Sequence, residues 1–209
     1  MADRCAGRES LVKPIQIFVE GGGSTVKTKS QLRLGFRDFL ERAGFVCRVI
    51  PCGPRDAAFR YWRTALSVDR EALNLLLVDS EGPVEEGSRL WRHLGRSDSS
   101  WQLPPETEDQ CHLMVQMMEA WFLADPEALA AYYGQHFGAK ALPGRENVEQ
   151  IAKSDVERSL KEATKRTQKG EYHKIRHGSD LLAKIDPAKV RRRAPHCERL
   201  LTMLAAAGS

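Results

Sequence analysis

One apolar run, residues 14–23 (PIQIFVEGGG), ends in a carboxylate and three glycines, and it constrains the fold more than any other part of the chain. Such a short apolar run, bounded by turn residues, is typical of a buried β-strand. The glycines allow a sharp exit from the strand and a close approach of the backbone to a ligand. Glu20 is therefore expected at the carboxyl end of a strand, which is where open α/β sheets bind ligands. A second apolar run, residues 73–78, ends in the same way in the acidic turn 79–81.

Strand and helix patterns alternate over the first eighty residues. Residues 25–43 repeat apolar side chains on one helical face and stop before Gly44, which is typical of a helix end. The expected elements of this part are strands at 15–20, 45–50 and 73–78, helices at 25–43 and 55–66, and a turn at 51–54. The order βαβαβ predicts an α/β fold with a mainly parallel central sheet and helices on both faces.

The second half of the chain begins with an irregular polar stretch, residues 82–109, and a loop of this length is usually functional or mobile. Beyond it we expect a strand at 112–117, helices at 118–125, 126–133, 156–166, 180–185 and 188–206, and a basic loop at 169–177. Three parts follow from this pattern. They are a loose leader (1–12), an α/β core (13–135) and a C-terminal basic, mostly helical extension packed on the core (136–209).

Cysteine content and hydropathy indicate where such a chain works. The five cysteines are odd in number and scattered, and no CxxC pair is present. This disfavours a disulfide framework or a zinc knuckle and fits a reducing cytoplasm. The first eleven residues lack the apolar centre of a signal peptide. No apolar stretch approaches the ~20 residues that a membrane helix needs. We therefore expect a cytoplasmic protein without a membrane partner.

Charge is distributed unevenly along the chain. The formal net charge is +4, but residues 71–130 hold twelve acidic and three basic side chains, whereas residues 151–209 hold fourteen basic and seven acidic ones. An acidic middle beside a basic end is compatible with a cation-binding centre flanked by a surface for a polyanion. Two ordinary solvated faces explain the same distribution, and charge alone does not separate these interpretations.

The acidic residues Glu20, Asp79 and Glu81 form the first candidate site. Two adjacent parallel strands would bring the three carboxylates to one sheet edge, where they repel one another unless a cation neutralises them. Hard oxygen ligands suit Mg²⁺ or Mn²⁺ and not zinc, and such ions commonly assist phosphoryl transfer. The alternative is that Asp79 and Glu81 cap a following helix, and their spacing favours neither reading.

The segment 119–125 (EAWFLAD) follows directly after an expected strand. Glu119 would add a fourth carboxylate to the same edge. Asp125 precedes a proline and is expected to cap the helix that begins there. Trp121 and Phe122 are expected in the core.

The basic loop at residues 169–177 places lysine, arginine and histidine side chains beside a tyrosine. These residue types can hold a phosphate backbone and stack a base. A solvated loop is the alternative interpretation. His173 and His177 have the i, i+4 spacing of zinc ligands, but no neighbouring glutamate completes an HExxH motif.

Two of these motifs, IFVEGGG and LLLVDSE, resemble the Toprim fold of primases, type IA and type II topoisomerases and OLD-family nucleases. Toprim domains have a glutamate after the first strand, matched by Glu20, and an Asp-x-Asp pair after a later strand, matched by Asp79 and Glu81. Glutamate at position 81 departs from that pattern and leaves the catalytic role of the pair open. A closer resemblance, over about residues 15–205, is to small Toprim-like proteins of unassigned function that share VEGGG, CGxRD, VDSE, HLMVQ-MEAWFLAD and KGxYHK blocks.

The resemblance implies a Mg²⁺-dependent (or Mn²⁺-dependent) nuclease that cleaves phosphodiester bonds in DNA or RNA, with tRNA among the candidate substrates. Glu20 would act as general base or metal ligand, Asp79 and Glu81 would hold the metal, and Glu119 would complete the site. The expected phosphate-binding residues are Arg55, Lys169, His173 and Lys174.

Related proteins are often encoded beside ABC-type ATPases in phage-defence islands, which implies an anti-phage effector that acts with such an ATPase. The alternative is a non-catalytic partner or sensor protein that keeps the fold and binds an ATPase, a nucleotide or nucleic acid.

Overall fold

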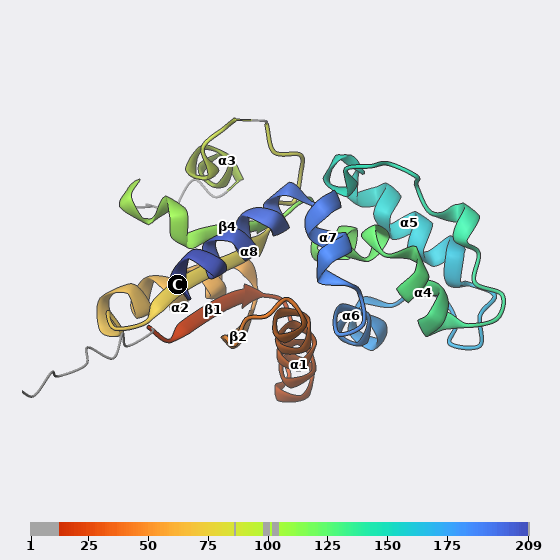
Figure 1. Ribbon diagram of the computed structural model, residues 1–209, viewed down its shortest axis with the longest axis horizontal. Coiled ribbons are helices and arrows are strands. Elements are labelled where there is room, and N and C mark those ends of the chain that lie inside the picture. The colour runs from red at the N-terminus through yellow and green to blue at the C-terminus, as the bar shows by residue number, and fades with distance from the viewer. Residues whose placement is uncertain (1–12, 86, 98–100, 102–104, 209) are drawn as a thin grey trace, which may run out of the picture.

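The computed structural model describes residues 13–85, 87–97, 101 and 105–208, so the expected leader at 1–12 lies outside the described residues. Figure 1 shows a lobe built around the sheet and, beside it, a lobe built only of helices. None of the helices in the described part of the chain combines the length and apolar composition that a membrane crossing needs. The four cysteines within the described ranges are all free.

Four parallel strands form the central sheet. They are β1 (Ile15–Glu20), β2 (Arg48–Gly53), β3 (Leu73–Asp79) and β4 (Cys111–Met114), in the order β2-β1-β3-β4. The central strands β1 and β3 are apolar on both faces, as parallel strands covered on both sides must be. Glu20 and Asp79 are the last residues of these two strands. The predicted α/β fold with a parallel sheet is confirmed.

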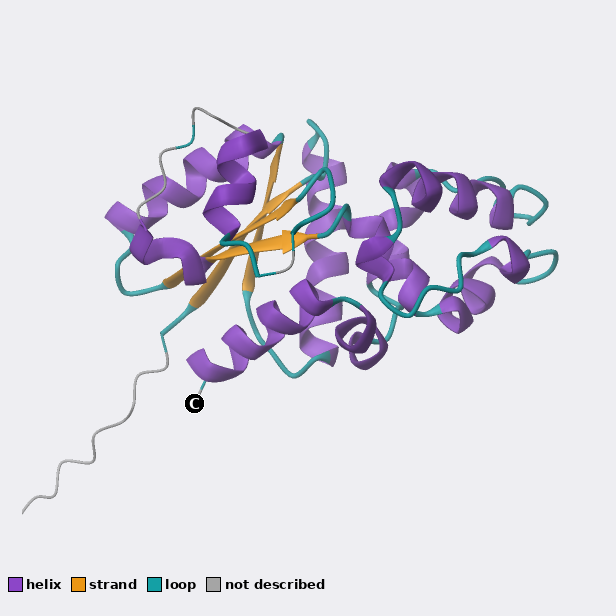
Figure 2. Ribbon diagram, turned by 90° about the horizontal axis from the view of Figure 1, so that it is seen from above, coloured by secondary structure: helices purple, strands orange, loops and turns teal. Residues whose placement is uncertain are grey.

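Helices cover both faces of the sheet, as predicted (Figure 2). Alternate residues of a strand point to opposite faces. Ile17 and Leu75 therefore pack with α1 (Val26–Arg42) and α8 (Pro195–Ala207), whereas Phe18 and Leu76 pack with α2 (Arg55–Val68) and α3 (Leu90–Ser97). Trp121 and Phe122 are buried in the first of these two clusters, as predicted.

The helical lobe contains a 3₁₀ helix (Met118–Ala124), α4 (Pro126–Tyr133), α5 (Lys153–Thr164), α6 (Lys174–Leu182) and α7 (Pro187–Arg193). Asp125 caps α4 as predicted, since its carboxylate accepts a hydrogen bond from the Ala128 amide. The boundary predicted at residue 135 falls inside this lobe, and α8 leaves it to pack beside β4.

The crossing of α1 and α6 joins the two lobes. At Gly35 a Cβ atom would lie 2.6 Å from the carbonyl oxygen of Ser179, so only glycine allows the two helices to approach this closely. Arg42 fixes the same contact from its other end, because its guanidinium donates to the carbonyl oxygens of Ala183 (2.6 Å) and Ile185 (2.7 Å). The α6 helix is thereby held in a defined position relative to β1 and α1.

The second strand begins and ends three residues later than predicted, and the turn expected at 51–54 is largely strand. Pro51 and Gly53 suggested a turn, yet both pair with β1, opposite Val19 and Glu20. Proline is tolerated there because β2 is an edge strand, where the missing N–H leaves no bond in the sheet unmade.

Three further segments differ from the sequence-based expectation. The irregular stretch 82–109 contains α3, whose Leu90 and Leu94 are buried one helical turn apart, and part of a 3₁₀ helix, Pro105–Gln110. The helix expected at 188–206 is two helices, because Pro195 follows Ala194 in an extended conformation. The expected strand at 112–117 runs instead from Cys111 to Met114.

Candidate metal centre

The carboxylates of Glu20, Asp79 and Glu81 converge at the carboxyl edge of the sheet. Each contributes an oxygen to a group in which all three atoms lie within 4.8 Å of one another. Glu20 ends β1 and Asp79 ends β3, and these neighbouring parallel strands stop at the same edge. The structure therefore brings together the three residues that the sequence selected.

The glycine loop after Glu20 keeps this edge open. Gly21, Gly22 and Gly23 have φ angles of 114°, 84° and 61°, a region that other residues rarely adopt. Gly21 exchanges two backbone hydrogen bonds with Gly53 at the end of β2, at 2.8 and 2.9 Å. A Cβ on Gly53 would lie 3.0 Å from the Gly23 carbonyl oxygen. Side chains at these positions would crowd the space beside the carboxylates.

The turn after β3 positions the third carboxylate. Glu81 has a φ of 62°, which is uncommon for a residue other than glycine. Its amide donates to the Gln116 carbonyl oxygen (3.0 Å), and the Ser80 amide donates to that of Met114 (3.0 Å). The last residue of β4 and the segment after it thus hold the turn in the conformation that directs Glu81 toward Glu20 and Asp79.

Hydrogen bonds orient Glu20 and Asp79. The Asp79 amide donates to Glu20 Oε2 (3.1 Å), and Asp79 Oδ1 accepts from the Met118 amide (2.8 Å). Asp79 therefore does cap a helix, but it is the distant 3₁₀ helix Met118–Ala124 and not the one that follows β3. The capping and clustering interpretations of Asp79 are compatible, because a carboxylate has two oxygens and only Oδ1 accepts the hydrogen bond from the Met118 amide.

Burial raises the pKa values of both carboxyl groups. The pKa of Asp79, which is 5 % exposed, rises to about 7, mainly because its charge is removed from water, and the neighbouring Glu20 and Glu119 act in the same direction. Burial also raises the pKa of Glu20, against the opposing effect of the Arg55 guanidinium. The two groups are more basic than free carboxylates and gain from a cation placed between them.

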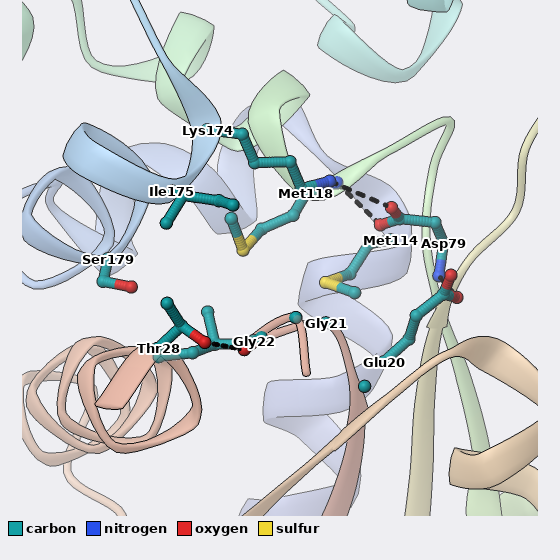
Figure 3. Close-up of a pocket in the computed structure, with 13 residues that line it drawn as sticks. Glu20, Gly21, Gly22, Thr28, Asp79, Met114, Met118, Lys174, Ile175 and Ser179 are labelled. Carbon is teal, nitrogen blue, oxygen red and sulfur yellow. Dashed lines mark hydrogen bonds and ion pairs between the residues drawn. The ribbon is translucent and has the colours of Figure 1, made fainter. Parts of the chain in front are cut away.

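Lys174 forms ion pairs with both Asp79 and Glu119 (Figure 3 shows Lys174, Asp79 and Glu20). The Lys174 ammonium is 3.3 Å from Glu119 Oε2 and 3.7 Å from Asp79 Oδ2. Burial alone would lower the pKa of Lys174, but these carboxylates outweigh it and raise the pKa to about 12. Glu119 is 1 % exposed, and its other oxygen accepts from the Tyr172 hydroxyl (3.0 Å). Glu119 therefore binds Lys174 and Tyr172 and does not join the other three carboxylates.

The four residues predicted to bind phosphate occupy different places. Lys174 lines the site, whereas Arg55 donates to the Asp79 carbonyl oxygen and its guanidinium lies over the Trp101 ring. Lys169 lies over the ring of Tyr132 at 4.7 Å, and His173 immediately precedes α6. Neither of these last two described side chains lines the cavity at the site. The predicted basic loop is also shorter than expected, because α6 begins at Lys174.

Lys153 is a site residue that the sequence analysis missed. It is the first residue of α5, and its ammonium lies 2.5 Å from Glu81 Oε2. The two residues are 72 positions apart, and no local motif links them. Only the path of the chain through the helical lobe brings Lys153 to the sheet edge.

A cavity of about 280 Å³ adjoins the carboxylates, between the glycine loop, α1 and α6 (Figure 3). Glu20 and Asp79 form part of its wall. The remaining lining residues are Gly21, Gly22, Gly23, Thr28, Leu32, Gly53, Met114, Met118, Lys174, Ile175 and Ser179. The site is thus an open acidic edge with a mainly apolar recess beside it.

The ligand atoms at this edge fit a hard divalent cation. All three are carboxylate oxygens, and no cysteine or histidine belongs to the group found among the described residues. Two lysines already contact the carboxylates, so a bound cation would share or displace their charge. The acidic cluster can therefore bind a metal ion, alongside or in place of the two lysine ammonium groups.

Comparisons with known proteins give one match. The protein family described as "Domain of unknown function (DUF4276)" matches residues 19–205, which include every residue of the acidic cluster. No curated protein and no solved structure matches the chain.

Proposed function

The chain belongs to the DUF4276 family, and we propose that it is a Mg²⁺-dependent or Mn²⁺-dependent nuclease that cleaves phosphodiester bonds in DNA or RNA. The observation that supports this most directly is the group of three carboxylate oxygens within 4.8 Å at the carboxyl edge of a parallel sheet. Asp79 is buried, Glu20 is half-buried and Glu81 is exposed, and carboxylates this close repel one another unless a cation or a proton neutralises them. The Toprim-like relationship expected from the sequence is part of this proposal.

The roles of the residues follow from their positions. Glu20, Asp79 and Glu81 would hold the metal, which would polarise a phosphoryl oxygen and lower the pKa of a bound water. Glu20 keeps one oxygen that accepts no hydrogen bond from a described residue, and its raised pKa suits it to take a proton from the attacking water. Lys174 reaches the same edge and would bind a non-bridging oxygen of the phosphate. Arg55 stabilises the end of β3 by donating a hydrogen bond to the Asp79 carbonyl oxygen.

A second candidate function follows from the lysines. Lys153 and Lys174 already pair with Glu81, Asp79 and Glu119, so the cluster is partly neutralised without any metal ion. A non-catalytic partner or sensor protein that binds an ATPase, a nucleotide or nucleic acid would need no more than this. Metal binding separates the two candidate functions, because the nuclease requires a metal ion and the non-catalytic partner or sensor protein does not.

Binding of Mn²⁺ should release a proton at pH values below about 7. The metal requires an ionised Asp79, whose pKa in the free protein is about 7, so part of the Asp79 population must lose its proton on binding. Affinity should fall as the pH is lowered from 8 to 6, and the proton release should vanish above pH 8. Isothermal titration calorimetry in buffers of different ionisation enthalpy measures both quantities.

Glu127→Gln is the matched control for that titration. It removes an acidic charge from an exposed position of α4 that pairs with Lys189, remote from the sheet edge. It should leave Mn²⁺ affinity and proton release unchanged. Absence of Mn²⁺ binding at pH 8 would contradict the nuclease proposal and favour the partner protein.

The cleavage assay needs a broad substrate panel. Purified protein would be incubated with Mg²⁺ or Mn²⁺ and with single-stranded and double-stranded DNA and RNA, tRNA included. The resemblance also motivates a test with any ABC-type ATPase encoded beside the gene, because a defence effector acting with such a partner would be silent alone. Products resolved on denaturing gels report cleavage directly.

Lysine substitutions should change the salt dependence of nucleic-acid binding. Each lysine that contacts a phosphate contributes about one unit to the slope of log Kd against log salt concentration. We expect Lys174→Ala to reduce that slope by about one. Lys169→Ala should do the same if the bound nucleic-acid strand extends past Tyr132 to Lys169. Lys184→Ala, at an exposed position just beyond the C-terminal end of α6, is the control. Fluorescence anisotropy at several salt concentrations measures the slopes, and an unchanged slope for Lys174→Ala would exclude it from phosphate binding.

A further inference from the structure

We infer that the cavity beside the carboxylates binds a single unpaired nucleobase, so that the substrate strand is engaged in a single-stranded or locally opened form. This inference rests on the proposed function and names the substrate class of the same site. It is carried by the continuity of the cavity with the acidic cluster, by its apolar walls and by the positive charge around its mouth.

The first argument is position. Glu20 and Asp79 belong both to the acidic cluster and to the cavity wall, so a ligand in the cavity lies against the carboxylates. A phosphate held at the metal would therefore place an adjoining nucleotide at the cavity. The volume, about 280 Å³, is just below the range of about 300–1,000 Å³ typical of small-molecule pockets. It suits one compact group and excludes a stacked base pair.

The second argument is the chemistry of the walls. Leu32, Met114, Met118 and Ile175 present apolar surface, and methionine side chains adapt well to flat rings. Enzymes that take a base out of a stack hold it between apolar or aromatic side chains and read its edge with polar groups. Ser179 supplies such a group, because its hydroxyl lines the cavity and forms no hydrogen bond with a described residue.

The third argument is charge. The cavity opens between the first turns of α1 and α6, and neither turn contains an acidic residue. Lys27 and Lys29 lie in the first turn of α1, and Lys174 and Arg176 in that of α6. Both helix dipoles add positive potential at the same place. A neutral lipid or a neutral metabolite would use the apolar walls but not this charge, whereas a nucleotide in a strand uses both.

Ile175 is the most informative residue for a test, because it lines the cavity and yet is 54 % exposed. Two variants change the cavity in opposite ways, since Ile175→Ala removes wall surface and Ser179→Leu fills space. Val68→Ala is the matched control, since it shortens an exposed aliphatic side chain at the end of α2, outside the lining residues. Melting curves would show that each variant is folded.

The experiment measures affinity by fluorescence anisotropy in Ca²⁺ and in EDTA, with labelled single-stranded DNA and RNA and with blunt duplexes of the same sequence. Wild-type protein should bind the single strand at least about tenfold more tightly than the duplex. Ile175→Ala and Ser179→Leu should each weaken single-strand binding roughly fivefold to tenfold and leave duplex binding within about twofold. A strand with one abasic position at the bound site should lose affinity for wild type but not for Ser179→Leu. The control should match wild type.

Several outcomes would overturn the inference. One is equal affinity for single strand and duplex, and another is a parallel loss for both ligands in the two variants. If free mononucleotides compete as tightly as the strand does, the ligand is a nucleotide and the strand assignment is wrong. The nuclease proposal is judged separately by Mn²⁺ binding and cleavage. If the wild-type protein cleaves but the two variants bind single strands as it does, only the base-pocket inference is wrong. If the protein prefers single strands but binds no metal, only the nuclease proposal is wrong.

Discussion

Asp79→Asn is expected to abolish Mn²⁺ binding and to reduce cleavage by at least roughly 10²-fold, while the protein becomes more stable to heat. Asparagine keeps the size of the side chain and can still accept the hydrogen bond from the Met118 amide. Asparagine lacks the negative charge that would hold the cation. In the metal-free protein Glu20 and Glu119 repel this charge, so its removal is stabilising. Activity and thermal stability should therefore change in opposite directions, which is the signature of a residue retained for function.

The stabilisation by Asp79→Asn should depend on pH. The pKa of Asp79 is about 7 in the folded protein and lies near the ordinary aspartate value of 3.8 in the unfolded chain. Ionisation therefore penalises the folded state increasingly as the pH rises from about 4 to 7, and fully above 7. The variant should match wild type near pH 4 and exceed it by on the order of 1–3 kcal/mol at pH 8. Thermal melts across this range, without metal, test the claim. A variant less stable than wild type at pH 8 would show that Asp79 serves the fold.

Lys174→Met is expected to have the opposite effect on the metal-free protein. It retains an aliphatic side chain of similar length but removes the ammonium that lies between Glu119 and Asp79. Glu119 is 1 % exposed, and a buried carboxylate that loses its cation is strongly destabilising. The lysine is half exposed, and solvent screening reduces the loss to about 1–3 kcal/mol. The melting temperature should fall by roughly 3–10 °C.

Two comparisons make the Lys174→Met result specific. The double variant Lys174→Met/Glu119→Gln should recover most of the lost stability, because the unpaired buried charge is gone. Mn²⁺ should raise the melting temperature of Lys174→Met more than that of wild type, since the metal replaces the missing positive charge. Arg176→Met, which removes an exposed cation from the same helical turn, should change neither quantity. If Lys174→Met and Arg176→Met behave alike, Lys174 does not neutralise the cluster.

The parts of the fold that the sequence predicted correctly are those in which local pattern and burial agree. The strand Ile15–Glu20 combines an apolar run, a terminal carboxylate and a glycine loop, and the structure reproduces its ends without change. Edge strand β2 was misplaced, because Pro51 and Gly53 signal a turn unless the strand lies at the edge, which only the tertiary arrangement decides. The start of α6 is not predicted by the sequence because Gly178, a poor helix former, lies in the middle of this short helix.

The residues of the site also fall into those that a local sequence pattern predicts and those that it does not. Glu20, Asp79 and Glu81 follow strands, and the rule that parallel strands end at one edge is sufficient to bring them together. Glu119 also follows β4, but it lies within the 3₁₀ helix, whose path carries its side chain to Tyr172 and Lys174. Lys153 and the cavity walls come from helices in another lobe, and their positions depend on long-range packing that no local pattern encodes.

The crossing of α1 and α6 at Gly35 and Ser179 also governs the order in which the site is assembled during synthesis. The three carboxylates emerge from the ribosome early, whereas Lys174 and the α6 wall of the cavity follow about a hundred residues later. At roughly 5–20 residues per second this interval lasts about 5–20 s. Contacts between such distant segments are also slow to form, because loop closure precedes any gain from packing. A partly synthesised chain therefore exposes the acidic cluster without Lys174 or its binding recess, and the centre is completed only after α6 has been synthesised and has packed on α1.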